Sequence, residues 1–265
     1  MIYPKTIYKY RDWNNKFHKR ILTEKEFFLA SPLSFNDPFD CRISENYHFL
    51  KDSYNQELYI ERMVNDYGER IKELGYDIEL TKENFREKIK DIDKLQKGVQ
   101  DYDAVQLANN FGVMSLSCRW DSIVMWSHYS NLHQGFCIGF DEEKIRKSNL
   151  FGKGGLVQYS EKFPERNPSI NLHPFIESSK MLYTKSKDWE YEQEFRLSIL
   201  NIEGLTLETR KVVVPDDSVS CIYLGLEIPI DHKLEILDIA RKEKIKVYQI
   251  SKVPFEYKLN RELLQ

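Results

Sequence analysis

Residues 187–200, KDWEYEQEFRLSIL, bring a run of charged side chains directly into a run of apolar ones. The apolar end must enter the core, so we predict that the whole segment is a β-strand. One face of such a strand would carry its charged residues, which are Glu190, Glu192, Glu194 and Arg196. Three adjacent carboxylates repel one another, which raises a pKa or demands a cationic partner, and sites of this kind are candidates for function. The alternative is a solvated strand edge on which Arg196 pairs with a glutamate.

Other segments of β-type composition are distributed over the whole chain. We predict strands at residues 2–11, 26–29, 111–118, 135–141, 154–159, 195–200, 210–215, 220–225 and 246–250. The spacing of apolar residues predicts helices at residues 14–22, 120–130, 175–184 and 230–244. Together these elements indicate an α+β protein. We interpret residues 1–265 as a single domain.

Residues 51–110 differ in composition from the rest of the chain. Charge rises, Gly and Pro almost vanish, and apolar residues such as Leu58, Met63 and Ile71 recur at helical spacing. A break is expected near Tyr76, with the next helix beginning close to Thr81. We interpret the segment as a helical insertion, either a solvated subdomain or a lid that binds a partner.

Composition excludes several classes of protein. The 265 residues are 41% hydrophobic and 31% charged, with a formal net charge of −3, so binding to nucleic acid through global charge is not expected. A local basic groove remains open as an alternative. The four cysteines have no C-x-x-C spacing, and no apolar run is long enough to span a membrane. We therefore expect a cytoplasmic protein with no membrane partner.

Several catalytic motifs are missing from the sequence. It contains no G-x-x-x-x-G-K-[ST] or G-x-G-x-x-G phosphate loop, no H-E-x-x-H and no G-x-S-x-G. Only His128 and His133 lie near each other among the six histidines, at a spacing that suits a metal pair poorly. We predict no metal ligands.

Aromatic residues make up 13% of the chain, and many of them lie beside polar motifs. Trp126 and Tyr129 share one face of a predicted helix, where core packing is the alternative to a pocket wall. Tyr8, Tyr10 and Arg11 follow one another on the first predicted strand, where they would meet an anionic or aromatic ligand or simply form an amphipathic edge. We interpret part of the aromatic fraction as the wall of a nucleotide pocket.

Four motifs outside the helical insertion stand out when they are taken together. They are Ile7-Tyr-Lys-Tyr10, Ser31-Pro-x-x-Phe-Asn-Asp-Pro-Phe-Asp40, Met125-Trp-x-x-Tyr129 with Gly135, and Lys187-x-Trp-x-x-Glu192-x-Glu194-Phe-Arg196. This set resembles a large, formerly uncharacterised bacterial family whose members occur in phage-defence and abortive-infection loci. The order of the elements is also similar to that of the ADP-ribosyltransferase superfamily, in particular its arginine, serine, glutamate class.

The second resemblance implies a fold and a set of roles. The fold would be an ADP-ribosyltransferase-like split mixed or antiparallel sheet, and the cofactor would be NAD. The catalytic residues would be Glu194, which stabilises the oxocarbenium-like state, Glu192, which orients or deprotonates the acceptor, and Ser115, which positions Glu194. Ser117 completes the Ser-x-Ser pair. The residues expected to bind the dinucleotide are Tyr8, Tyr10, Arg11, Asn36, Asp37, Trp126 and Tyr129.

The resemblance implies an ADP-ribosyltransferase effector that acts as a toxin in antiviral defence. Its acceptor would be RNA, DNA or protein, and a neutralising antitoxin would be a further partner. One alternative is a nuclease whose Asp37, Asp40, Glu192 and Glu194 gather a divalent metal. The other is a non-enzymatic sensor that binds a nucleotide or peptide in the aromatic cleft.

Overall fold

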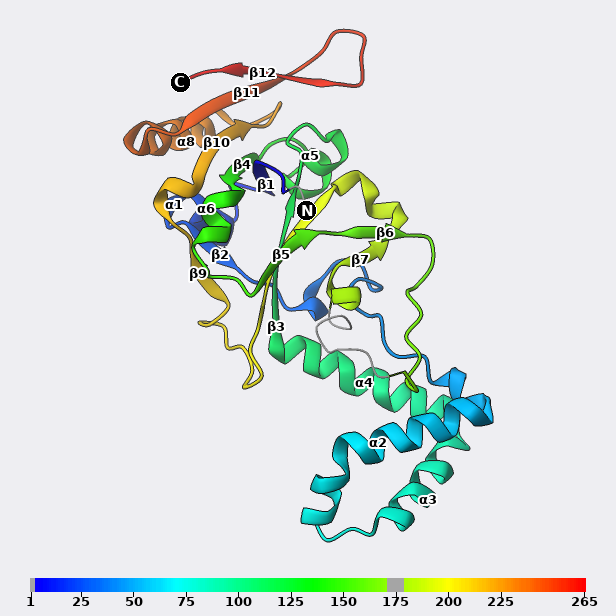
Figure 1. Ribbon diagram of the computed structural model, residues 1–265. Helices are drawn as coiled ribbons and strands as arrows, with labels where there is room; N and C mark the ends of the chain where they lie inside the picture. Colours follow the sequence, from blue (N-terminus) through cyan, green and yellow to red (C-terminus); the bar gives the residue numbers. More distant parts are fainter. Residues whose placement is uncertain (1–2, 171–178) are drawn as a thin grey trace.

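A mixed β-sheet forms the centre of the computed structural model, which describes residues 3–170 and 179–265 (Figure 1). Within these residues the sheet has eight strands in the order β12-β11-β10-β4-β1-β3-β8-β5. Their bounds are β1 Thr6–Arg11, β3 Phe111–Ser117, β4 Phe136–Asp141, β5 Lys153–Leu156, β8 Glu194–Leu200, β10 Val219–Leu224, β11 Lys246–Lys252 and β12 Leu259–Leu263. All neighbours are antiparallel except β10 and β11, which are parallel. The predicted α+β class is confirmed.

Two pairs of short strands lie outside this sheet. β2 (Glu26–Phe28) pairs antiparallel with β9 (Lys211–Val213), and β6 (Gln158–Ser160) pairs parallel with β7 (Thr184–Ser186). Short 3-10 turns connect several elements, namely η1 Pro32–Ser34, η2 Tyr47–Lys51, η3 Lys187–Glu192 and η4 Asp216–Ser218.

Helices cover the two faces of the large sheet differently. The apolar side chains of β1, β4, β10 and β11 alternate, so that Ile7, Ile222 and Val247 share a core with helices α1 (Lys16–Thr23), α6 (Glu142–Lys147) and α8 (Ile230–Glu243). The opposite face packs Tyr10 and Tyr223 against α5 (Ile123–Tyr129). This second face leads to the cavity described below.

Residues 51–110 are helical, as their pattern predicts, and form α2 (Ser53–Glu73), α3 (Ile78–Ile89) and α4 (Ile92–Asn110). An aspartate side chain, Asp52, Asp77 or Asp91, caps the start of each helix. The start of α3 falls a few residues before the predicted position, and the break at Asp91 interrupts a segment that we expected to be one helix. Figure 1 shows α2 and α3 extending away from the sheet, with α4 leading back to it. That these helices are an insertion in a single domain stays a prediction.

A buried arginine holds α4 to the sheet. Arg210 donates to the carbonyl oxygens of Ala108 at 2.5 Å, Phe111 at 3.0 Å and Leu29 at 3.2 Å. Because α4 ends at Asn110 and β3 begins at the next residue, this one guanidinium joins the last turn of the helix to the first residue of the strand.

The structure differs from the sequence-based expectation at residues 187–200. Residues Lys187–Glu192 form the turn η3, Gln193 adopts the left-handed conformation with φ 43°, and β8 begins only at Glu194. The predicted face with three glutamates therefore does not exist, and Glu190 is exposed to solvent. The alternating pattern is correct only for Glu194 and Arg196, which both belong to β8.

Three smaller points complete the comparison. Strand β12 was not predicted, because its exposed residues show little apolar alternation. Four of the ten residues of the helix predicted at 175–184 lie outside the described residues; of the others, 179–182 are helical and Thr184 already begins β7. No helix among residues 3–170 and 179–265 has the length and apolar character needed to cross a bilayer.

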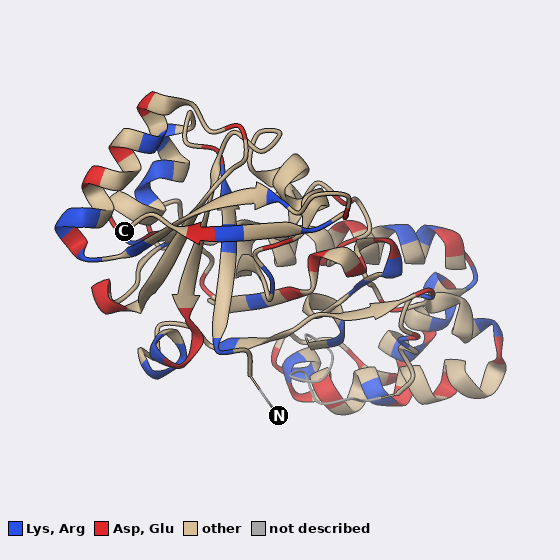
Figure 2. Cartoon of the chain, turned by 90° about the horizontal axis from the view of Figure 1, so that it is seen from above, with Lys and Arg blue, Asp and Glu red and all other residues tan. Residues whose placement is uncertain are grey.

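Charged side chains of both signs are mixed along the helices. Figure 2 shows Lys and Arg interspersed with Asp and Glu on α2, α3, α4 and α8, whereas the strands are mostly uncharged. The charges that do lie on the central strands therefore stand out, and several of them surround one cavity.

Candidate functional site

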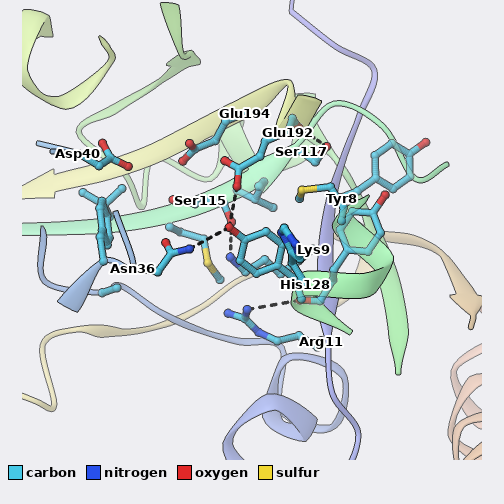
Figure 3. Close-up of a pocket in the computed structure, with 18 of the residues that line it drawn as sticks. Tyr8, Lys9, Arg11, Asn36, Asp40, Ser115, Ser117, His128, Glu192 and Glu194 are labelled. Atoms are coloured by element: carbon cyan, nitrogen blue, oxygen red, sulfur yellow. Dashed lines mark hydrogen bonds between the residues drawn. The ribbon is translucent and has the colours of Figure 1, made fainter. Parts of the chain in front are cut away.

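A cavity of about 450 Å³ opens where β1, β3 and the start of β8 lie side by side, beneath α5 and the loop before η2. Tyr8 of β1 is opposite Ser117 of β3, and Ser117 is opposite Glu194 of β8. Three adjacent strands thus place a tyrosine, a serine and a glutamate in one line across the floor. Figure 3 shows the side chains that project into this space.

Glu194 lies at the centre of a buried network of charges. The guanidinium of Arg196 donates to both of its carboxylate oxygens, from Nε at 2.6 Å and from Nη2 at 3.0 Å. The ammonium of Lys185 lies 3.2 Å from Oε2. Burial alone would raise the pKa of Glu194, but Arg196 and Lys185 lower it from 4.5 to about 2. Glu194 is therefore ionised at neutral pH.

Arg196 is fully buried and has further partners that hold it in place. Its Nη2 donates to Asp40 at 2.5 Å, and its Nη1 donates to the carbonyl oxygen of Leu182 at 2.7 Å and to the sulfur of Cys41 at 3.2 Å. These contacts leave the guanidinium one orientation, so the direction of the Glu194 carboxylate is set by the chain around it.

Glu192 is held by different groups from those that hold Glu194. Its Oε2 accepts a hydrogen bond from Lys185 at 2.6 Å, and its Oε1 accepts one from the Tyr129 hydroxyl at 2.6 Å. Burial and the nearby Glu192 charge raise the pKa of Tyr129, so this hydroxyl keeps its proton and acts as a donor. The side-chain amide of Asn36 donates to the same hydroxyl at 3.4 Å. Tyr129 and Asn36 thus connect the loop between η1 and η2 to Glu192.

The two serines of β3 have separate contacts. The Ser117 hydroxyl donates to the backbone carbonyl of Glu192 at 2.6 Å and accepts from the backbone N–H of Arg119 at 3.1 Å. A hydrogen bond from the Ser115 side chain contributes to the low pKa of Glu194. Ser117 therefore holds the backbone of one glutamate, while Ser115 acts on the carboxylate of the other.

Two basic residues of β1 line the cavity, and the charges of Glu192 and Glu194 act on one of them, Lys9. Lys9 donates to the backbone carbonyl of Ser115, and the Arg11 guanidinium donates to the carbonyl of Tyr10 at 3.4 Å. Neither has a carboxylate partner among the described residues. Burial lowers the pKa of Arg11 to about 10, and burial together with the Arg11 charge lowers that of Lys9 well below its usual value. Arg11 is therefore charged at neutral pH, whereas an anion in the cavity would favour the protonated form of Lys9.

The structure places some of the predicted site residues elsewhere than expected. Trp126 is completely buried and does not line the cavity; its indole N–H donates to the carbonyl of Trp120 at 2.7 Å. Tyr10 packs edge-on against Trp126 and reaches the cavity only in part. Asp37 also lies off the cavity, because its carboxylate accepts from the backbone N–H of Phe39 at 2.8 Å within the loop. Core packing and a loop turn explain these three residues.

The other predicted residues do meet at this cavity, and the structure adds others that were not predicted. Those expected from the sequence are Tyr8, Arg11, Asn36, Ser115, Tyr129, Glu192 and Glu194. The additions include Lys9, Lys185 and His128. Adjacent glutamates demand a cation, which is the signal that pointed to a group such as Lys185, but spacing in the sequence does not identify which cation it is.

The carboxylates do not gather as a metal site would require. Lys185 and Arg196 occupy the positions between Asp40, Glu192 and Glu194, and Asp37 lies in a separate part of the loop. Within residues 3–170 and 179–265 no three His, Cys, Asp or Glu residues are arranged to hold a metal ion.

Comparison with known families finds one match. Residues 125–197 match a family described as "Protein of unknown function (DUF2971)". The matched segment runs from α5 to β8 and includes Tyr129, Lys185, Glu192, Glu194 and Arg196. It agrees with the resemblance to an uncharacterised family. Searches of curated proteins and of solved structures found no match.

Proposed function

We propose that this protein transfers ADP-ribose from NAD to an acceptor. The observation that supports it most is the alignment of Tyr8, Ser117 and Glu194 across three adjacent strands on a cavity of about 450 Å³. This volume lies within the range of small-molecule sites. The resemblance to ADP-ribosyltransferases implies the same order of strands, with Arg11 or Tyr10 rather than Tyr8 as the residue of the first strand.

The charges of the cavity suit the two ends of a dinucleotide. Lys9 and Arg11 lack carboxylate partners and would bind the diphosphate, for which arginine is well shaped. Figure 3 shows the glutamates across the cavity from Arg11, where the nicotinamide ribose would then be placed. Opposite charges on opposite walls would orient NAD in one direction.

The reaction would break the bond between ribose C1′ and the nicotinamide nitrogen. Nicotinamide leaves with the bonding electron pair, and positive charge develops on the ribose. Ionised Glu194 would stabilise this charge, since a fixed carboxylate in a site of low dielectric costs little reorganisation. The acceptor forms the new bond to C1′ and gives its proton to Glu192. Lys185 and Arg196 would keep Glu194 ionised, and Lys185 would hold both carboxylates in place.

The biological setting is proposed from the resemblance alone. We propose a cytoplasmic toxin of an antiviral defence system, held inactive by an antitoxin until infection. The acceptor would be nucleic acid or protein.

Labelled NAD tests the proposal directly. The purified protein is incubated with NAD carrying a label in the adenylate half, together with total RNA, DNA or lysate, and each fraction is analysed for label. We expect nicotinamide release and labelling of one fraction, with a loss of about 100-fold or more in Glu194→Gln. Glu190→Gln removes an exposed glutamate of the same segment and should retain activity. Unchanged turnover in Glu194→Gln, or no NAD consumption with any acceptor, would reject the proposal.

A chelator separates the nuclease alternative from this reaction. ADP-ribose transfer by the residues described needs no divalent ion, so activity should persist in EDTA. Cleavage of RNA or DNA that EDTA abolishes would support the nuclease. If the cavity binds a nucleotide without turning it over, the sensor alternative holds.

A further inference from the structure

A stack of aromatic rings crosses the sheet face next to the cavity. Trp120, in the loop after β3, stacks on Tyr223 of β10 with ring centroids 4.8 Å apart and planes at 5°, and Tyr223 stacks on Tyr248 of β11 at 5.2 Å and 18°. Arg261 of β12 lies along the stack, 5.3, 5.7 and 4.9 Å from the three ring centroids, and donates to the Tyr223 hydroxyl. We call Trp120, Tyr223, Tyr248 and Arg261 the aromatic platform.

Strand alternation adds positive charge to the same face. On β11, Lys246 and Lys252 share a face with Tyr248, whereas Val247 packs in the core with α8. On β12, Arg261 lies opposite Ile250 and shares its face, whereas Glu262 lies opposite Gln249 and points to the other side. Strands β11 and β12 therefore contribute cations, and no carboxylate, to the platform face.

These cations are not neutralised within the chain. Lys246, Lys252 and Arg261 are exposed, and none has a carboxylate partner in the part of the chain that the structure describes. The nearby acids belong to loops: Asp121 pairs with Arg119 at 2.9 Å, Glu256 pairs with Lys258 at 2.5 Å, and Glu227 lines a groove under the β11–β12 hairpin. Trp120 and Tyr248 keep part of their surface accessible.

The platform is continuous with the cavity. Tyr8 lines the cavity and packs edge-on against Tyr223, with ring centroids 6.0 Å apart. The platform and the cavity therefore border each other at the contact between Tyr8 and Tyr223.

We propose that the aromatic platform binds single-stranded nucleic acid. Aromatic rings that stack bases, combined with cations that track the phosphates, are the two features that such binding requires. Tyr223 is 1% exposed and supports the other two rings, so Trp120 and Tyr248 are the rings that a base could reach. An acidic peptide would use the cations and leave these two rings unused, and duplex DNA hides its base faces. The net charge of −3 does not oppose this, because phosphates respond to charge within about 10 Å at ordinary salt. The further step, that the bound strand is the acceptor of ADP-ribose, rests on the proposed function; binding itself does not.

Fluorescence anisotropy of labelled uridine and thymidine oligonucleotides of about 12 residues tests the binding. The platform variant combines Lys246→Gln, Lys252→Gln and Arg261→Gln. The control combines Lys147→Gln, Arg241→Gln and Lys242→Gln, which remove the same charge from exposed positions on α6 and α8. We expect the platform variant to weaken binding at least tenfold at about 50 mM salt and to reduce the slope of log K against log salt by about 2, against no change in slope for the control.

Stacking is tested separately from charge. Tyr248→Leu should weaken binding severalfold without altering the salt slope, since it removes a ring and no cation. Thermal unfolding of each variant shows whether it is folded, and Tyr248→Phe should restore binding if the ring matters through stacking.

Three results would overturn the proposal. They are no oligonucleotide binding by the wild-type protein at low salt, equal losses in the platform and control variants, and binding of polyglutamate or duplex DNA as tight as that of the single strands. The assay is run without NAD and also in Glu194→Gln, so its outcome is independent of catalysis. Binding without NAD turnover would reject the proposed function and leave the platform intact; turnover on protein without oligonucleotide binding would do the reverse.

Discussion

Charged side chains on two sides of the cavity differ in whether they have partners of opposite charge. On the β8 side, Glu192 and Glu194 are each held by a cation at hydrogen-bond distance, and Arg196 is itself fixed by Asp40. On the β1 side, Lys9 and Arg11 bond only to backbone carbonyls within the described residues. A closed network holds its members in place without any ligand, whereas an open set of cations gains its counter-charge from something that enters. The glutamates and their cations therefore have a structural role, whereas Lys9 and Arg11 are available to bind a ligand.

The closed network should fail when its central cation is removed. Arg196→Met leaves the buried Glu194 and Asp40 with Lys185 as their one remaining cation among the described residues, and we expect the free energy of unfolding to fall by about 3–5 kcal/mol. Chemical denaturation measures it. Lys147→Met breaks the exposed pair with Glu143, whose side chains are 70% and 62% exposed, and should cost less than about 1 kcal/mol. Equal effects of the two variants would show that Arg196 does not hold Glu194 and Asp40 in a stabilising network.

Acid should also destabilise the charge network around Glu194. The pKa of Glu194 is about 2 in the folded protein, below its ordinary value of 4.5, so its contribution is complete above about pH 5 and is lost as pH falls from 4.5 towards 2. The loss amounts to about 3 kcal/mol. Unfolding curves recorded between these pH values should fall steeply for the wild-type protein and less steeply for Glu194→Gln. Parallel curves would contradict the assignment of the low pKa to Glu194.

The tyrosine on Glu192 tests the network at its edge. Tyr129→Phe removes a 2.6 Å hydrogen bond to a carboxylate and should lower stability by about 1.5–2 kcal/mol. The matched control is Tyr191→Phe, whose hydroxyl lies 3.3 Å from His128 at an exposed position, and a change below about 0.5 kcal/mol is expected there. Thermal or chemical unfolding of both variants gives the comparison, and an equal response would place Glu192 outside the network.

The open wall should respond with the opposite sign. Lys9→Met removes a buried amine that forms no ion pair among the described residues, so we expect stability at neutral pH to be unchanged or higher by up to about 1 kcal/mol. Because burial lowers the Lys9 pKa in the folded state, the unfolded chain binds more protons, and the wild-type protein should gain on the variant as pH rises towards 10.5. Inorganic pyrophosphate should raise the unfolding temperature of the wild-type protein more than that of Lys9→Met. A large destabilisation would show that the two walls are alike.

Local pattern predicted much of the fold. The helices of residues 53–110 follow from apolar spacing and aspartate caps, and the central strands follow from apolar runs. The pairing of Glu194 with Arg196 is also local, since residues two apart on a strand share a face. These features depend on residues that are close in the sequence, so the sequence pattern is enough to predict them.

The remaining features depend on distance in space. The left-handed Gln193 ends η3 and brings Glu192 towards Lys185, yet its side chain carries no glycine-like signal for that conformation. Trp126 and Tyr10 pack against each other in the core. Polar residues beside them in the sequence led to the prediction that both line the pocket, which is wrong for Trp126. Lys185 meets the glutamates from β7, outside the large sheet, whereas Lys9 lies on β1 and forms no ion pair with them; composition and spacing specify neither position.

The direct passage from α4 into β3 has a mechanical consequence. With 19 residues, α4 is about 28 Å long, and it turns into the strand of Ser115 and Ser117 without a flexible linker. Arg210 fixes the junction between α4 and β3, with α2 and α3 on one side of it and a strand of the cavity floor on the other. We therefore expect a displacement of α2 and α3 to be transmitted through α4 to β3.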